Sequence, residues 1–343
     1  MSSPSELRKD PISGRWVIIA AERSKRPDDF RPAKPAERPR SVPAFCPFCP
    51  GNEAKTPPEI LALAGAGPEP GRAPWSVRVV PNKFPALSPG AAPARVKRGL
   101  FESMDGIGVH EVVIESPDHD TEMADLPRGH LRDILAVYQA RLRALEAEPT
   151  YAYTQLFKNK GLEAGASLFH PHTQIVALPI VPKRVKEELY AAERFHKQTG
   201  SCLFCRTLGE ERAAAERIVR TNARFAAYVP FASRFPFETH ILPVRHEPLF
   251  SAAAEDALDD LADILGGVLS RMKSLLADPS YNLVLHQSAH PARARRRWPG
   301  FEAFAHWYLE IIPVLTHVAG FEWGTGFYIN PVAPESAAKF LRD

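Results

Sequence analysis

Two stretches of the chain space their apolar residues as an amphipathic helix does. In residues 131–145 and 258–276 the apolar side chains recur every three or four positions, so they form one stripe along a helix. Each stretch leads into segments rich in β-branched and aromatic residues, which are typical of strands. These segments begin at Tyr151 and His170 in the first half and at Tyr281 and His306 in the second. The pattern predicts a helix followed by two strands, occurring twice.

One of these segments, SLFHPHTQIVALP at residues 167–179, carries polar side chains in an apolar setting. Side chains alternate between the two faces of a strand, so His170, His172 and Gln174 point the same way. Burying three polar groups on one face is unfavourable unless each of them has a partner. We therefore expect this face of the strand to bind a metal or a ligand.

The four cysteines form two Cys-x-x-Cys pairs, and each pair precedes histidines in the same order. In a reducing compartment such pairs indicate a metal site or thiol redox chemistry rather than structural disulfides. Two thiolates and two imidazoles make a closed tetrahedral zinc site. The sequence predicts two zinc ions per chain, one held by Cys46, Cys49, His119 and His170 and the other by Cys202, Cys205, His246 and His306. His286 is the alternative to His306 as the last ligand of the second set.

The composition is that of a globular protein, with 45% hydrophobic and 24% charged residues among 343. A net charge of +3 is too small to favour nucleic acid or an anionic membrane as a partner. No run approaches the roughly 18 apolar residues of a transmembrane helix, and the first residues lack the apolar core of a signal peptide. We expect a cytoplasmic protein with neither a nucleic-acid partner nor a membrane partner.

Several motifs resemble the galactose-1-phosphate uridylyltransferases, a branch of the histidine-triad superfamily. The resemblance is carried by FKNKGLEAGASLFHPHTQ and extends over most of the chain. It includes ISGRWVIIAAERSKRP, CPFCPGNE, VVPNKFPAL, SPDH and the C-terminal GFEWGTGFYINPVAPESAAKFLR. The string Asn-x-Gly…Ser-x-x-His-Pro-His-x-Gln is the specific part of this resemblance, whereas a single Cys-x-x-Cys pair is common.

The resemblance implies an α+β fold of two histidine-triad-like repeats, each an antiparallel sheet packed with helices. We predict that residues 1–182 form the N-terminal repeat, with the catalytic His-Pro-His. Residues 183–343 then form the C-terminal repeat, with a structural zinc and a segment on the sugar side of the site. The resemblance also implies a homodimer with active sites near the subunit interface. The implied partners are a nucleotide sugar and a sugar 1-phosphate, joined by ping-pong nucleotidyl transfer.

The resemblance assigns roles to individual residues. His172 attacks the α-phosphorus of a UDP-sugar, and a backbone carbonyl close to His170 fixes its ring. Gln174 stands where histidine-triad hydrolases carry a third histidine. Because an amide can donate to a phosphoryl oxygen but cannot move protons, we expect a transferase rather than a hydrolase. The expected substrate ligands are Gln174, Asn82 and Phe84, Asn159 and Ser167, Arg23 and Arg26 from across the dimer interface, and Phe321 on the sugar.

Two features depart from the better-known galactose enzymes. Those enzymes lack the second Cys-x-x-Cys pair. In having this pair, the chain resembles a branch of the family that includes plant enzymes acting on ADP-glucose. In the galactose enzymes a Lys-Phe pair and a Tyr-Glu pair hold the hexose. The matching positions here are Gly320-Phe321 and Thr325-Gly326, so only the phenylalanine survives. Neither the hexose nor the base is therefore fixed by the sequence.

The second half lacks a His-x-His motif. Aligned on Pro179 and Pro313, His306 lies opposite His172, so we predict one catalytic half and one structural half. The predicted function is that of a UDP-glucose–hexose-1-phosphate uridylyltransferase, working through a uridylyl-His172 intermediate. One alternative is an ADP-glucose phosphorylase or adenylyltransferase with the same covalent mechanism. Another is a non-catalytic, zinc-stapled module that binds nucleotides.

Overall fold

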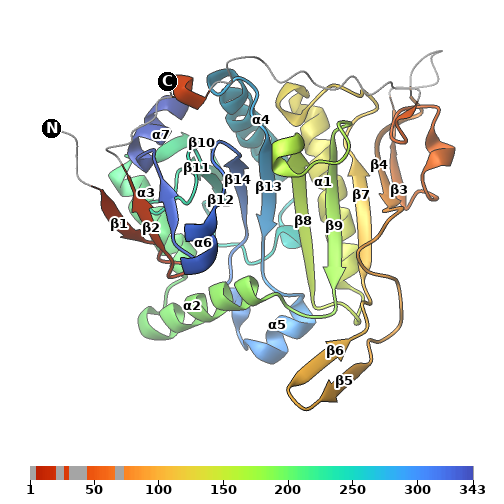
Figure 1. Cartoon of the computed structure of the whole chain (residues 1–343), viewed down its shortest axis with the longest axis horizontal. Helices are drawn as coiled ribbons and strands as arrows, with labels where there is room; N and C mark the ends of the chain where they lie inside the picture. Colours follow the sequence, from red (N-terminus) through yellow and green to blue (C-terminus); the bar gives the residue numbers. More distant parts are fainter. Residues whose placement is uncertain (1–4, 21–26, 31–44, 66–72, 343) are drawn as a thin grey trace.

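Ten strands from both halves of the chain form one antiparallel sheet (Figure 1). The structure is a computed structural model and describes residues 5–20, 27–30, 45–65 and 73–342. From one edge of the sheet to the other, its strands are Ile218–Thr221 (β10), Phe225–Tyr228 (β11), Thr239–Pro243 (β12), Tyr308–Pro313 (β14), Tyr281–His286 (β13), Tyr153–Lys160 (β8), His172–Leu178 (β9), Val109–Ile114 (β7), Trp75–Pro81 (β4) and Leu61–Ala64 (β3).

The strand order reflects the repeat in the sequence. Counted outward from the centre of the sheet, the first half runs β8, β9, β7, β4, β3 and the second half runs β13, β14, β12, β11, β10. The halves meet where β8 and β13 pair, from Lys160 opposite Tyr281 to Leu156 opposite Leu285. The predicted α+β fold with antiparallel sheets is confirmed, and the structure adds that the two half-sheets are continuous. The boundary at residues 182 and 183 stays a prediction.

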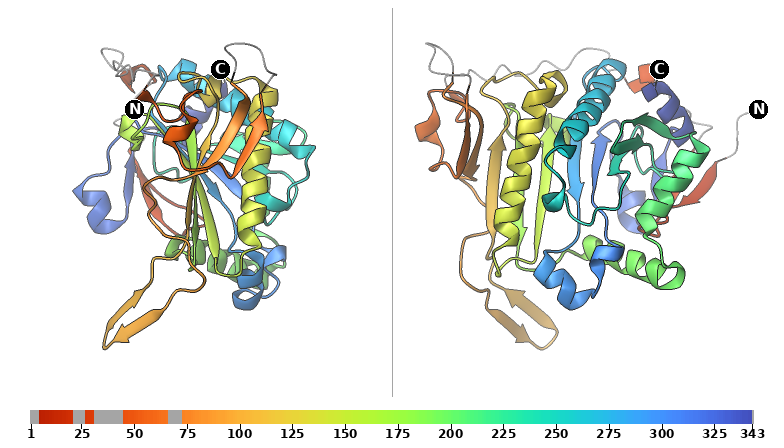
Figure 2. Two further views of the ribbon diagram at one scale, coloured as in Figure 1. Left: turned by 90° about the vertical axis from the view of Figure 1, so that its right-hand side faces the viewer. Right: turned by 180° about the vertical axis from the view of Figure 1, so that it is seen from behind.

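Two long helices cover one face of this sheet. Helices α1 (Arg128–Glu146) and α4 (Ala257–Leu275) lie side by side on it (Figure 2). Their apolar stripes are buried, as the sequence pattern predicts, and pack in one core with inward-facing strand residues such as Ile175 and Leu285. Because strand side chains alternate, residues such as His172 and Gln174 project from the opposite face.

The opposite face is covered unevenly. Helices α2 (Lys183–Thr199) and α3 (Leu203–Ala214) pack against outward residues of the second half, such as Tyr228 and Tyr308. In the first half, Phe157, Gln174 and Val176 are only partly buried on this face. The covering elements therefore leave an accessible strip of sheet beside His172.

The remaining elements lie around the sheet. A small sheet combines β1 (Glu6–Lys9), β2 (Trp16–Ile19) and β15 (Tyr328–Asn330). A hairpin of β5 (Arg95–Arg98) and β6 (Phe101–Met104) projects from the body (Figure 1). The other helices are α5 (Pro291–Arg297), α6 (Gly320–Thr325) and α7 (Pro334–Arg342). No helix in the described ranges is both long enough and apolar enough to cross a membrane.

Candidate active site and metal centres

His172 opens strand β9 and lies at the centre of the candidate site. Its ring is 6% exposed, and Nδ1 donates a hydrogen bond to the carbonyl oxygen of His170 at 2.8 Å. Burial lowers the pKa of His172, which favours the neutral ring. With the proton held at Nδ1, the lone pair is at Nε2, so His172 has the tautomer that a nucleophile at Nε2 needs.

Four of the predicted metal ligands come together beside this ring. The ligand atoms of Cys46, Cys49, His119 and His170 all lie within 4.8 Å of one another. His170 uses Nε2 to donate to the Ser116 carbonyl oxygen at 2.8 Å, which leaves Nδ1 for a metal. Burial lowers the pKa of His170 to about 4, so the ring is neutral, as a ligand must be.

The spacing of these atoms fits zinc. In a tetrahedral site with ordinary Zn–S and Zn–N bonds, sulfur and nitrogen lie about 3.6 Å apart. Cys49 Sγ lies 3.2 Å from His119 Nδ1 and 3.6 Å from His170 Nδ1, and Cys46 Sγ lies 3.7 Å from His170 Nδ1. Burial and the neighbouring Cys46 raise the pKa of Cys49 to about 12. Two buried thiolates side by side need a cation, and the donor set fits one.

The second cysteine pair forms a similar cluster. Cys202, Cys205 and His246 place their ligand atoms within 4.8 Å of one another, and Cys205 Sγ lies 3.4 Å from His246 Nδ1. The ring of His306 lies beside this group, with its centroid 5.5 Å from that of His246. Its Nδ1 donates to the Trp307 carbonyl oxygen, and its buried Nε2 has no hydrogen-bond partner among the described residues.

His286, the alternative last ligand, is engaged elsewhere. Its Nε2 lies 2.8 Å from Glu310 Oε2, and its ring stacks on Tyr308 with centroids 4.3 Å apart. Both the ring face and Nε2 of His286 are therefore occupied by contacts inside the second half. The geometry therefore favours His306 over His286 beside the second cysteine pair.

Gln174 is held by a histidine of the neighbouring strand to which the sequence analysis assigned no role. Gln174 Oε1 lies 2.8 Å from Nε2 of His110 on β7, and the Ala86 N–H donates to His110 Nδ1 at 3.2 Å. Asn82 Nδ2 lies 3.1 Å from the same Nε2 atom, so Asn82 is brought next to Gln174. Asn82 Oδ1 accepts the Phe84 N–H at 2.9 Å.

Asn159 lies at the same end of the accessible strip as His172, because β8 and β9 are antiparallel and Phe157 pairs with Gln174. It is on β8, and its Oδ1 accepts a hydrogen bond from Asn282 Nδ2 on β13 at 2.9 Å. Ser167 is exposed, Phe84 is 83% exposed and Phe321, on α6, is 45% exposed. Within the described ranges no hydrogen bond joins these three side chains to His172 or Gln174. Arg23 and Arg26 lie outside the described residues.

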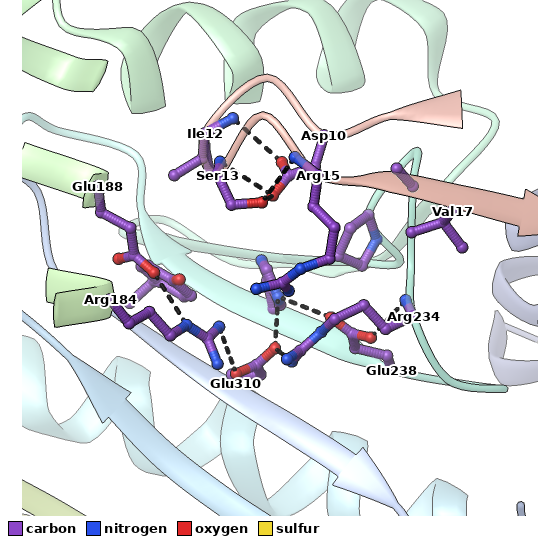
Figure 3. Close-up of a pocket in the computed structure, with 14 residues that line it drawn as sticks. Asp10, Ile12, Ser13, Arg15, Val17, Arg184, Glu188, Arg234, Glu238 and Glu310 are labelled. Carbon is purple, nitrogen blue, oxygen red and sulfur yellow. Dashed lines mark hydrogen bonds and ion pairs between the residues drawn. The ribbon is translucent and has the colours of Figure 1, made fainter. Parts of the chain in front are cut away.

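In the second half, charged side chains occupy the region that corresponds to the surroundings of His172. His170 and His306 each lie two residues before a strand, so the strand starts match Tyr308, not His306, with His172. This differs from the alignment on the prolines. Arg184 and Arg234 approach Glu310 in this region (Figure 3). Two imidazoles of the second half, His240 and His286, lie against Glu310 in this region. The division into one catalytic and one structural half stays a prediction.

Sequence reasoning missed two other groups near His172. The ring of Phe48, between the first two cysteines, meets His172 edge-on with centroids 5.4 Å apart, which couples the metal loop to the ring. Behind β9, Lys158 Nζ lies 2.7 Å from Glu115 Oε2, and Thr173 Oγ1 donates to Glu115 Oε1 at 2.6 Å. Strand alternation puts Lys158 on the helix side of β8, and its carboxylate partner is 43 positions away in the sequence.

Known families and proteins match the chain over most of its length. The family described as galactose-1-phosphate uridyl transferase, N-terminal domain, matches residues 2–182, and the corresponding C-terminal domain matches residues 186–333. ADP-glucose phosphorylase of Arabidopsis thaliana is 36% identical over 340 residues, covering 98% of this chain and 92% of the relative. Galactose-1-phosphate uridylyltransferase of Thermotoga maritima is 30% identical over 345 residues, covering 98% of each.

Solved structures agree with these matches. The crystal structure of the Arabidopsis thaliana ADP-glucose phosphorylase with bound ADP-glucose has a TM-score of 0.80 and 34% identity, over 99% of each chain. A structure of a uridylyltransferase has a TM-score of 0.73 and 32% identity, over 98% of this chain and 97% of the other. The likeness therefore extends through both halves of the molecule.

Proposed function

Because the chain belongs to the galactose-1-phosphate uridyl transferase family, whose members are nucleotidyltransferases, we propose that it transfers a nucleotidyl group from a nucleotide sugar through His172. The observation that carries the proposal is the His172 ring itself. It is buried and neutral, and its proton is held at Nδ1 by the His170 carbonyl. Nε2 is thereby prepared for attack on phosphorus.

The reaction has two half-steps. His172 Nε2 attacks the α-phosphorus of the nucleotide sugar, and a nitrogen–phosphorus bond forms. The bond from the α-phosphorus to the oxygen that bridges to the β-phosphate breaks, and the sugar 1-phosphate leaves with that electron pair. An oxygen of a second phosphate then attacks the same phosphorus and releases the neutral imidazole.

The neighbours of His172 support transfer over hydrolysis. Gln174 can donate a hydrogen bond to a phosphoryl oxygen, but its amide cannot act as a base toward water near neutral pH. Gln174 is bound to His110 at 2.8 Å, so the side chain is held in place on the strand beside the nucleophile. Such a site lets a nucleotidyl-histidine persist until a second phosphate arrives.

Two metal centres support the site structurally. The first cluster would hold zinc through Cys46, Cys49, His119 and His170, and four protein ligands leave no open position for substrate. Bound there, zinc would neutralise the buried thiolates and anchor the residue whose carbonyl orients His172. Cys202, Cys205 and His246, with His306 beside them, would hold a second zinc in the other half. We propose two zinc ions per chain.

ADP-glucose and UDP-glucose are the two candidate donors. Uridylyl transfer from UDP-glucose to a hexose 1-phosphate is the sequence-based prediction, and a uridylyltransferase at 30% identity supports it. ADP-glucose as donor, with inorganic phosphate or a sugar phosphate as acceptor, is supported by the relative at 36% identity. The second cysteine pair and the missing sugar-binding pairs around Phe321 also favour the ADP-glucose branch.

The test is covalent labelling. The protein is incubated with ADP-glucose or UDP-glucose labelled at the α-phosphate, and the labelled peptide is identified by mass spectrometry. We expect acid-labile label on His172 from one donor, with release of glucose 1-phosphate. Chasing with inorganic phosphate or galactose 1-phosphate identifies the acceptor. Absence of label from both donors would contradict the covalent mechanism.

One variant distinguishes the proposed enzyme from the alternative, a non-catalytic module that binds nucleotides. His172→Ala removes the nucleophile and leaves the neighbouring metal ligands in place. We expect turnover to be lost while nucleotide binding, measured by calorimetry, is kept. If neither wild type nor variant turns over any donor and both bind nucleotide equally, the module is the better description.

A further inference from the structure

We propose that Asn282, on the strand β13 of the second half, positions Asn159 of the first half for phosphate binding. This inference rests on the proposed function, because it treats Asn159 as a ligand of the transferred phosphate. The two residues are direct cross-strand neighbours where β13 pairs with β8. Their side chains are on the accessible face of the sheet, and both are partly buried.

The orientation of the Asn282 amide is set by a backbone group. Asn282 Nδ2 donates to the carbonyl oxygen of Ala164 at 3.0 Å and to Asn159 Oδ1 at 2.9 Å. A carbonyl oxygen can only accept, so the nitrogen of Asn282 must face Ala164. The same NH₂ group supplies both hydrogens, and Asn159 must therefore present its oxygen to Asn282 rather than its nitrogen.

This arrangement leaves the Asn159 nitrogen as a donor for a ligand. Among the described residues none accepts a hydrogen bond from Asn159 Nδ2. The atom lies over Gly165, where an added Cβ would stand 3.7 Å from it, and Gly165 has a φ of +88°. An amide that is already fixed with its nitrogen outward can donate to a phosphoryl oxygen without a free-energy cost of reorientation when the substrate binds.

The start of β13 also supports the loop that leads to His170. A Cβ on Gly161, which has a φ of +83°, would meet Ser280 Oγ at 2.2 Å, so this loop lies directly on the residues before β13. Asn282 then fixes the end of the short 3₁₀ turn Leu162–Ala164 through the Ala164 carbonyl. The second repeat thus supplies both the support of the loop and the orientation of its neighbouring amide.

The experiment uses an isosteric substitution in a double-mutant cycle. Asn282→Asp keeps the shape of the side chain but removes the donor, so Asn159 must turn its nitrogen inward. We measure single-turnover labelling of His172 and the donor's dissociation constant for wild type, N282D, N159A and the double variant. N282D is expected to slow labelling about tenfold or more, with a smaller change in affinity. In the N159A background the same change should cost less than about twofold, because its effect passes through Asn159.

A matched control is available in the same chain. Asn222 also donates from Nδ2 to a backbone carbonyl, that of Asp260 at 2.7 Å, far from the site in sequence and on the edge of the second half. Asn222→Asp should leave the labelling rate unchanged. If N282D does not fold cooperatively, N282A replaces it and is expected to slow labelling in the same, Asn159-dependent way.

The outcomes separate the inference from the function it rests on. No label on wild-type protein overturns the proposed function. Label with a normal rate in N159A overturns the phosphate role of Asn159, and the inference with it. A slow N159A with a normal rate in N282D, or with rate losses that simply multiply in the double variant, overturns the inference alone.

Discussion

At the scale of single residues, several histidine rings near the proposed sites share one type of contact. His172, His170 and His246 each donate one ring N–H to a backbone carbonyl, at 2.8, 2.8 and 2.7 Å. A neutral imidazole has only one N–H, so each bond fixes which nitrogen carries the lone pair. In two rings that nitrogen faces a cysteine cluster, and in His172 it is the proposed nucleophile.

The same reasoning predicts the last ligand of the second metal centre. His306→Ala should lower the metal content by one ion per chain, because its buried Nε2 has no hydrogen-bond partner in the part of the chain that the structure describes. His286→Ala should leave the content unchanged, because its Nε2 is bound to Glu310 at 2.8 Å. Elemental analysis of the purified proteins measures both. Loss in His286→Ala but not in His306→Ala would reverse the assignment.

The contacts of His240 predict that the folded protein loses stability as the pH becomes alkaline. Burial alone lowers the pKa of His240, but Glu238 and Glu310, with Oε1 atoms 3.5 and 3.4 Å from Nε2, outweigh it and raise the pKa to about 9. The folded protein therefore binds this proton more tightly than the unfolded chain, whose histidines have a pKa of about 6.5. The stabilisation is fully present below that lower value, falls as pH rises between the two and is gone above about 9.

The measurement is denaturant unfolding of wild type and His240→Gln at several pH values from neutral to alkaline. The free energy of unfolding of wild type should fall more steeply than that of the variant over this window. Titration of cysteines and lysines affects both proteins alike, so the difference between the two curves isolates His240. Parallel curves would mean that His240 carries no extra proton in the folded state.

At the scale of elements, a half-buried ion pair joins helix α2 to strand β14. Arg184 on α2 lies 3.4 Å from Glu310 Oε2 and 3.2 Å from Glu188 Oε1. Arg234 pairs with the same Glu310, and the two side chains are 10% and 1% exposed. These contacts attach the helix between the two repeats to the face of the sheet opposite α1 and α4.

Removing one of the arginines that pair with Glu310 should lower the free energy of unfolding. Arg234→Met leaves the Glu310 carboxylate buried with fewer partners, which typically lowers the free energy of unfolding by about 3–5 kcal/mol. The control is Arg206→Met, whose pair with Glu210 is 66% and 68% exposed and whose loss should cost less than about 1 kcal/mol. Chemical denaturation compares the two. Equal losses would show that the buried pairs contribute no more than a surface pair.

The elements themselves were predictable from local pattern, and their pairing was not. Both amphipathic stripes became long helices, and His172 and Gln174 share a face of β9, because these features depend on residues close in sequence. The contacts of Gln174 with His110 and of Asn159 with Asn282 join residues 64 and 123 positions apart. Such contacts depend on the register between strands, which a single sequence with period-2 alternation does not specify.

At the scale of the whole molecule, the two repeats share one sheet and one core. The core between the sheet and the long helices contains residues of both halves, including Leu135 of α1 and Leu265 of α4. β8 and β13 add a continuous ladder of hydrogen bonds between them. Among the described residues, the apolar side chains on this side of the sheet form one cluster that both halves share.

We therefore expect the protein to unfold in one transition. Scanning calorimetry of the purified protein should give a single endotherm whose calorimetric and van't Hoff enthalpies agree. Loss of the signal for the buried tryptophans, Trp75 in the first half and Trp298 and Trp307 in the second, should coincide with it. Two separated transitions would instead show that the halves are stable on their own.

The ladder between β8 and β13 has a consequence for any attempt to divide the chain. A fragment ending before α2 would present β8 as a bare edge, and the complementary fragment would present β13 in the same way. Unpaired central strands attract other strands. Produced together, the fragments should reassemble by closing this ladder; produced apart, each should pair with copies of itself and aggregate.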